Sequence, residues 1–151
     1  MRGESGGMAR AAGNAGYGIS IPGTLDGLRE GLDLLGRWLK RHGVGREAEN
    51  NARLVFEEIV TNIVRHGFDD RGEHKIDVVL SLSGDGLTLV FDDKGRPFDP
   101  LKAPKPPRSS SLDTAPIGGR GLLLVKHAAK GLAYERTEDG RNRLTVALAL
   151  S

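Results

Sequence analysis

The run Glu57-Glu58-Ile59-Val60-Thr61-Asn62 is followed closely by His66-Gly67. It lies inside an apolar pattern with the period of an α-helix. At 100° per residue, one narrow stripe holds Ala52, Val55, Phe56, Ile59 and Ile63. The pattern predicts a helix from about Arg46 to His66, with Gly67 as its C-terminal stop.

Glu58 and Asn62 are four residues apart and therefore share one face of this helix, at the margin of the apolar stripe. A carboxylate and an amide in that position can face a cleft together. Glu58 could then orient or deprotonate a hydroxyl group, and Asn62 could bind Mg²⁺ through its carbonyl oxygen. Taken alone, the same spacing is more often two ordinary polar residues beside a buried stripe.

The flanking sequence predicts the other layer of the fold. Leucines at helical spacing indicate a helix from about Thr24 to Arg41, and a further apolar stretch indicates one from Leu122 to Ala129. Alternating apolar residues predict five strands, at 17–21, 75–82, 87–92, 132–138 and 143–150. Consecutive strands at hairpin spacing imply an α+β two-layer sandwich, with a mostly antiparallel or mixed sheet and helices on one face. We expect residues 1–16 to be a disordered leader and residues 17–151 to form one domain.

A second cluster begins at the end of the strand predicted at 87–92, with Asp92-Asp93-Lys94-Gly95. Aspartate at a strand end can accept a hydrogen bond from an exocyclic amine such as that of adenine. Gly95 allows the backbone to turn close to a ligand. The alternative is a turn that merely caps the strand, where Asp and Gly are common.

A third cluster, Gly118-Gly119-Arg120-Gly121, follows a loop at about 101–117 that is rich in proline and serine. Glycines that open a helix offer free backbone N–H groups and the positive end of the helix dipole to phosphates. The Lys-Ser/Thr ending of a Walker P-loop is absent. The alternative is a flexible hinge before a helix.

Together the three clusters resemble the N, G1 and G2 boxes of the Bergerat-fold (GHKL) ATPases, over residues 17–150. Within that superfamily the chain is most similar to the anti-sigma factor serine/threonine kinases. The residues that carry this closer resemblance are Glu58 to Asn62 with His66-Gly67, the run from Gly95 to Pro100, and Gly-Gly-x-Gly-Leu followed by Tyr134-Glu135-Arg136 and Gly140-Arg141-Asn142.

The resemblance implies ATP and Mg²⁺ as cofactors and gives each motif residue a role. Asn62 would coordinate the Mg²⁺ that bridges the ATP phosphates, and Glu58 would be the general base. Asp93 would bind the adenine amine, beside Gly95, with Thr145 as a further adenine contact. Gly119 and Gly121 would donate backbone hydrogen bonds to the phosphates, and residues 101–117 would form a lid.

The implied function is an anti-sigma factor that phosphorylates a small anti-anti-sigma antagonist, binds a sigma factor and forms a homodimer. Two alternatives stay open. The first is a nucleotide-gated protein-binding module without phosphotransfer, and the second is a detached histidine-kinase-like ATPase domain. Retention of both Glu58 and Asn62 favours catalysis. We interpret His66 as a capping or packing residue, and Arg65 and Arg120 as solvated.

Composition excludes several other classes of protein. The chain has no cysteine, so disulfides and thiolate metal sites are excluded. Its 22 basic and 20 acidic residues leave a net charge of only +2, and aromatic residues make up 5%, which disfavours nucleic acid as a partner. No apolar run approaches the roughly 20 residues of a membrane-spanning helix. We expect a cytoplasmic protein.

Overall fold

The computed structural model describes residues 15–68, 73–102 and 117–150. The predicted leader and lid therefore lie largely outside the described residues. At their margins, Ala15 and Gly16 belong to the first strand, Leu101 and Lys102 belong to a short 3₁₀ helix, and Ile117 begins a helix.

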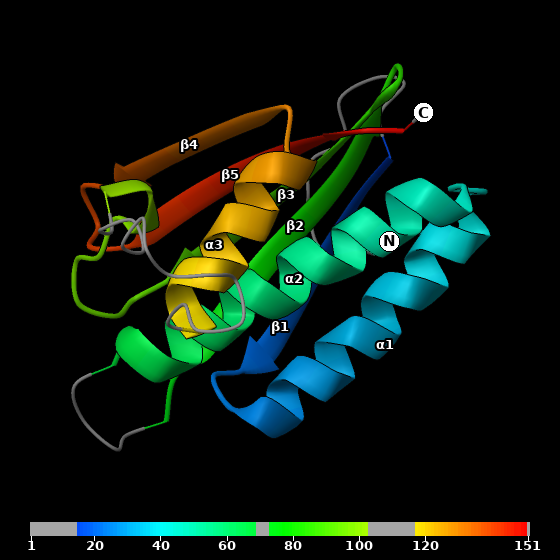
Figure 1. Cartoon of the computed structure of the whole chain (residues 1–151). Coiled ribbons are helices and arrows are strands. Elements are labelled where there is room, and N and C mark those ends of the chain that lie inside the picture. Colours follow the sequence, from blue (N-terminus) through cyan, green and yellow to red (C-terminus); the bar gives the residue numbers. More distant parts are fainter. Residues whose placement is uncertain (1–14, 69–72, 103–116, 151) are drawn as a thin grey trace.

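Three helices cover one face of a five-stranded sheet (Figure 1). The elements follow the chain as β1 (Ala15–Pro22), α1 (Leu25–Arg41), α2 (Arg46–His66), β2 (Lys75–Ser83), β3 (Gly86–Asp93), η1 (Pro100–Lys102), α3 (Ile117–Ala128), β4 (Gly131–Arg136) and β5 (Asn142–Ala149). The strand order is β1-β2-β3-β5-β4, and every neighbouring pair is antiparallel. The predicted two-layer α+β sandwich is confirmed.

The helix ends follow local signals in the sequence. The Thr24 hydroxyl accepts a hydrogen bond from the Gly27 N–H at 3.0 Å, so Thr24 caps α1. Helix α2 has the predicted limits and ends at Gly67. The prediction for the third helix was wrong at its start, because α3 begins at Ile117 rather than Leu122. The glycine cluster therefore lies within the first turns of α3.

The core fills the space between α2 and the centre of the sheet. Helix α2 contacts both α1 and α3, so it is the central helix of its layer. Phe56 is fully buried, and its ring centroid lies 5.9 Å from that of Phe91 on β3. A Cβ atom at Gly31 would overlap the Phe56 ring, so the glycine allows α1 to approach α2 closely.

Strict alternation along the strands sorts polar side chains onto two faces. Asp93 and Asn142 face the helices and are paired directly across β3 and β5. Their sequence neighbours Asp92 and Arg143 face the opposite side, which no helix of the described residues covers. One end of the sheet therefore carries two separate sets of polar groups, one on each face.

Leu35→Ala should lower the free energy of unfolding by about 2–5 kcal/mol, because Leu35 is fully buried and its truncation leaves a cavity. Leu25→Ala on the same helix is the matched control. Leu25 is 56% exposed, so we expect a change of no more than about 0.5 kcal/mol. Urea unfolding of both variants checks this, and equal losses would contradict the described packing of α1.

Candidate functional site

A pocket lies between α2 and the ends of β3, β4 and β5. Its walls are mostly apolar, and its polar lining comes from few side chains. The lining residues are Ile59, Asn62, Ile63, Gly67, Phe91, Asp93, Phe98, Pro100, Tyr134, Asn142 and Leu144. An apolar pocket with a few convergent polar groups is the usual form of a small-molecule site. The structure thus brings together Asn62 and Asp93, which are 31 residues apart in the chain.

Asp93 lines this pocket and has one carboxylate oxygen that receives hydrogen bonds. The residue is only 4% exposed. Its Oδ1 accepts hydrogen bonds from the Gly95 N–H at 2.8 Å and from Asn142 Nδ2 at 3.1 Å. Its Oδ2 accepts none from the described residues. Burial raises the pKa of Asp93, while the hydrogen bonds from Asn142 and Gly95 and the nearby charge of Arg136 oppose that rise.

The loop after β3 is fastened to the C-terminal end of α2. The Arg96 N–H donates to the Gly67 carbonyl at 2.8 Å, and Arg96 Nε donates to the His66 carbonyl at 2.8 Å. A Cβ atom at Gly95 would overlap the Gly67 carbonyl and crowd the Asp93 carboxylate. Glycine at position 95 is therefore needed for the close approach of this loop to α2, in addition to any room that it leaves for a ligand.

Asn62 is a buried amide without a full set of partners. It is 7% exposed and lines the pocket. Its Nδ2 has no hydrogen-bond partner among the described residues. Because buried polar groups are nearly always paired, an unpaired amide aimed at a pocket indicates a place for a ligand.

Glu58 lies against α3. A Cβ atom at Gly121 would overlap the Glu58 carboxylate, so the absence of a side chain there is what admits the carboxylate. Burial and then the charge of Glu57 raise the pKa of Glu58, while Arg65 lowers it. A carboxyl group with a raised pKa is better matched to accept a proton near neutral pH. The first and third motifs of the sequence thus meet at one point.

Gly119 and Gly121, the glycines of α3 that were predicted to bind phosphate, occupy different positions relative to the free N–H groups of the helix. Only the first four N–H groups of a helix lack intrahelical partners. Gly119 is the third residue of α3 and falls within that set, whereas Gly121 is the fifth. While α3 is intact, the Gly121 N–H is used in a hydrogen bond within the helix and is not available to a phosphate. Gly121 instead makes a close contact with Glu58.

The structure does not bring Thr145 to the pocket. Thr145 pairs with Val90 and Ala133 and lies on the open face of the sheet, opposite the pocket. The residue of β5 that lines the pocket is Asn142. Alternation could have identified it, because Asn142 heads the inward series that continues with Leu144, Val146 and Leu148.

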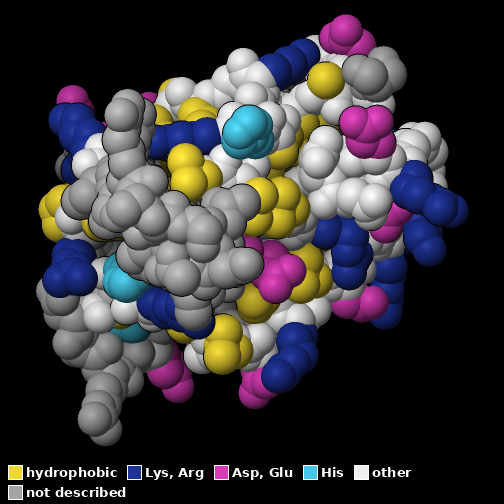
Figure 2. Space-filling view, viewed as in Figure 1, with side chains coloured by type: hydrophobic (Ala, Val, Ile, Leu, Met, Phe, Trp, Pro, Cys, Tyr) yellow, Lys and Arg dark blue, Asp and Glu magenta, His cyan; other side chains and the backbone are white. Residues whose placement is uncertain are grey.

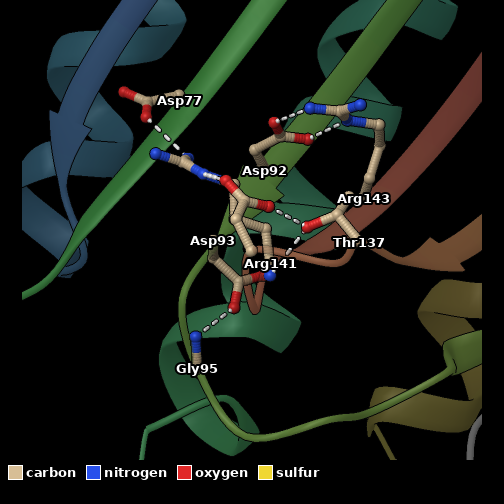
Figure 3. A network of polar contacts seen from close by, with 8 residues as sticks. Asp77, Asp92, Asp93, Gly95, Thr137, Arg141 and Arg143 are labelled. Atoms are coloured by element: carbon tan, nitrogen blue, oxygen red, sulfur yellow. Dashed lines mark hydrogen bonds and ion pairs between the residues drawn. The ribbon is translucent and has the colours of Figure 1, made fainter.

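A polar network supports the strand ends from the other face (Figure 3). Arg143 donates two hydrogen bonds to Asp92, at 2.9 and 2.8 Å, and so joins β5 to β3. Arg141 reaches Asp77 on β2 at 3.5 Å and also pairs with Asp139 in the β4–β5 turn. These contacts tie together the strands that carry Asp93 and Asn142.

The rest of the described residues form no other site that is as well defined as this pocket. A larger, more open hollow beside Phe68, Lys75 and Lys94 contains none of the predicted site residues. No group of three or more metal-ligating side chains is found in residues 15–68, 73–102 and 117–150. On the helical face, basic and acidic side chains are dispersed rather than gathered in a stripe (Figure 2). No helix in those ranges is long and apolar enough to cross a membrane.

A comparison with known protein families matches residues 21–148 to the histidine kinase-like ATPase domain. The chain belongs to this family. Membership in an ATPase family implies that the chain binds ATP. The resemblance to this superfamily that the three motifs predicted is confirmed.

Two curated relatives are similar to part of this chain. Serine/threonine-protein kinase BtrW of Bordetella bronchiseptica is 38% identical over 93 residues, which cover 62% of this chain and 65% of the relative. Anti-sigma F factor of Clostridium novyi is 22% identical over 98 residues, which cover 65% of this chain and 68% of the relative. The chain thus matches just under two thirds of the length of BtrW.

Solved structures confirm the fold. The RsbU and RsbW domains of a Mycobacterium tuberculosis protein give a TM-score of 0.62 at 18% identity, covering 89% of this chain and 32% of that chain. The SiaB–SiaC complex from Pseudomonas aeruginosa gives a TM-score of 0.51 at 12% identity, covering 87% of this chain and 88% of that chain. At these identities the likeness establishes the architecture.

Asp93→Asn should stabilise the fold at neutral pH and weaken adenine nucleotide binding. The amide oxygen can accept the same two hydrogen bonds, while the buried charge is removed. Because the folded-state pKa of Asp93 is raised, the wild-type chain gains stability as the pH falls through that pKa toward the ordinary value of about 4. The advantage of the variant should therefore shrink on acidification.

Urea unfolding at about pH 7 and about pH 5, combined with calorimetric titration of ADP, measures both effects. The exposed Asp85 in the β2–β3 turn supplies the control Asp85→Asn, for which neither quantity should change. A variant at position 93 that binds ADP as tightly as the wild-type chain would contradict the role of Asp93.

Proposed function

We propose that this chain is an ATP-dependent serine/threonine protein kinase that acts as an anti-sigma factor. The observation that carries the proposal is the meeting of the three motifs. Asn62 and Asp93 line one pocket, and Glu58 contacts Gly121 near the start of α3. The identity of 38% with a serine/threonine-protein kinase supports the same reading.

The pocket suits the adenine base. Its apolar walls would enclose the ring, and the free Asp93 Oδ2 would accept a hydrogen bond from the exocyclic amine. Guanine would present a carbonyl oxygen to this carboxylate, and two acceptors repel each other. A site that hydrogen-bonds one group in this way strongly rejects a base that lacks it.

The phosphates would extend from the base toward α3 and Asn62. The first N–H groups of α3, including that of Gly119, would donate to phosphate oxygens at the positive end of the helix dipole. Asn62 fits a role in holding Mg²⁺, because its buried amide is incompletely paired and its carbonyl oxygen is a hard ligand. When bound, Mg²⁺ neutralises charge on the phosphates.

Glu58 would act on the hydroxyl of the substrate. As the serine oxygen forms its bond to the γ-phosphorus, the bond from that phosphorus to the β–γ bridging oxygen breaks. The hydroxyl proton passes to the Glu58 carboxylate, and the products are phosphoserine and ADP. This chemistry depends mainly on positioning and charge neutralisation, so a covalent intermediate with the enzyme is not required.

The proposed substrate is a small anti-anti-sigma protein, and the proposed second partner is a sigma factor. A relative named anti-sigma F factor supports this assignment. A phosphate adds about −1.5 to −2 charge to the substrate, enough to change which partner is bound. A homodimer and a cytoplasmic location stay predictions that rest on the family resemblance.

The nucleotide-gated binding module is the second candidate. One observation favours it: the Glu58 carboxylate is in direct contact with α3, so in this conformation the helix lies against the proposed base. In that case ATP or ADP would set the position of α3 and thereby control partner binding, without phosphotransfer.

Glu58→Gln should reduce phosphotransfer by about 100- to 10,000-fold, because the amide cannot accept the hydroxyl proton. Nucleotide binding should be retained, since Glu58 is not among the pocket-lining residues. The measurement is label transfer from γ-labelled ATP to a small protein in an extract of the source cells.

Glu57→Gln is the matched control for this experiment, because Glu57 is the exposed neighbour and should leave transfer nearly unchanged. Persistent transfer by the position 58 variant would exclude Glu58 as the base. An absence of transfer by every form, with tight ADP binding, would support the nucleotide-gated module.

Gly121→Ala should also impair transfer. The added methyl group would occupy the place of the Glu58 carboxylate and displace it, and misplacing a catalytic group by about 1 Å can cost about 100-fold in rate. Gly36→Ala is the control, because its methyl group would displace only the tip of Arg53 between α1 and α2. Retained transfer in the position 121 variant would show that the contact with Glu58 is dispensable.

A further inference from the structure

Asn142 is a buried side chain whose amide uses every hydrogen-bonding position it has. Its Oδ1 accepts from Tyr134 Oη at 2.5 Å and from the Phe98 N–H at 3.3 Å. Its Nδ2 donates to Asp93 Oδ1 at 3.1 Å and to the Arg96 carbonyl at 2.8 Å. The residue is 7% exposed, so water has little access to these polar atoms.

The contacts with Phe98, Asp93 and Arg96 fix the orientation of the amide. If the amide were reversed, its NH₂ group would face the Phe98 N–H, and its oxygen would face the Arg96 carbonyl and the Asp93 carboxylate. These three contacts would then be unfavourable, whereas the Tyr134 hydroxyl could accept from the NH₂ group instead of donating. Because the other three partners place Oδ1 toward Tyr134, the Tyr134 hydroxyl donates to it and so holds the oxygen end of the amide.

This orientation determines which oxygen of Asp93 is left for a ligand. Asn142 and the Gly95 N–H both donate to Oδ1, so Oδ2 is the oxygen without a partner among the described residues. Asn142 also holds the loop after β3 at two points, Arg96 and Phe98. The rotation of the carboxylate and the position of the loop thus depend on one amide.

We propose that Tyr134 and Asn142 form a relay that positions the Asp93 carboxylate to bind the exocyclic amine of an adenine nucleotide. Both are positioning residues that act through Asp93. The proposal rests on the adenine-binding role of Asp93 proposed above. The relay couples the edge strand β4, which carries Tyr134, to selection of the base in the pocket.

A packing role alone does not account for Asn142. The next inward residues of β5, Leu144 and Val146, fill their positions with aliphatic side chains. A buried amide at the head of that series is unfavourable unless its polar atoms are paired, and here they are paired with groups that belong to the site. Among charged groups, Arg136 on β4 lowers the pKa of Asp93 and Asp92 on β3 raises it.

The test uses Asn142→Asp, which keeps the size of the side chain and its Oδ1 acceptor but replaces the donor with an oxygen. At about pH 8 the two carboxylates should repel each other, and ADP binding should weaken at least about tenfold. On acidification a shared proton restores a donor to Asp93, so affinity should recover. The affinity of the wild-type chain should only fall over the same range.

Tyr134→Phe supplies a second variant that keeps the aromatic ring and removes the donor to Asn142. Tyr17→Phe is its control, because Tyr17 is the other tyrosine of the chain and stacks on Trp38, away from the pocket. We expect the position 134 variant to bind ADP several-fold more weakly and to raise the pKa of Asp93, because the hydrogen bond from Asn142 lowers that pKa.

The pKa of Asp93 is read directly by carboxyl ¹³C NMR on the nucleotide-free protein, so the relay is tested even if ADP does not bind. An unchanged pKa in both variants, or a loss of ADP affinity in Asn142→Asp that does not vary with pH, would overturn the relay. A shifted pKa with unchanged ADP affinity would keep the link to Asp93 and refute the adenine-binding role.

Discussion

The carboxylate of Asp93 is the constraint on which the site depends. A buried charge costs several kcal/mol unless it receives hydrogen bonds, and here the donors come from the Gly95 N–H and from Asn142. Supplying them requires the loop after β3 to turn back at Gly95 and β5 to lie in register with β3. The same turn brings Arg96 to the end of α2 and so sets the distance between the sheet and the central helix.

Because side chains alternate between the two faces of the sheet, the strand ends carry a different set of polar groups on each face. On the helical face, Asp93 and Asn142 form a polar patch in an apolar pocket. On the open face, Asp92 and Arg143 pair, and Arg141 reaches Asp77. The ion pairs on the open face lie outside the pocket, but they join the strands. Asp93 and Asn142 can pair only when those strands are in register. Separating the two sets by the thickness of one sheet keeps Arg143 from neutralising the carboxylate that binds the ligand.

The sequence predicted most of the fold and part of the site. Helix α2 was predicted correctly because a long apolar stripe indicates the helix and Gly67 marks its end. The strands were predicted from the alternation of apolar residues. The start of α3 was missed because glycines are poor helix formers, and packing against α2 decides their conformation. Alternation along β5 places Asn142 on the inward face, but Thr145 was chosen instead, because no local pattern shows that Asn142 pairs with Asp93 across β3 and β5. The contact between Glu58 and Gly121 also depends on tertiary packing that no local pattern encodes.

The proposed function requires the three motifs to form one ATP site. A crystal structure of the chain with Mg²⁺ and a non-hydrolysable ATP analogue would show whether they do. We expect the adenine amine to lie on Asp93, the metal on Asn62, and the γ-phosphate between Glu58 and the start of α3. A nucleotide bound elsewhere, for example in the open hollow beside Phe68 and Lys94, would contradict it.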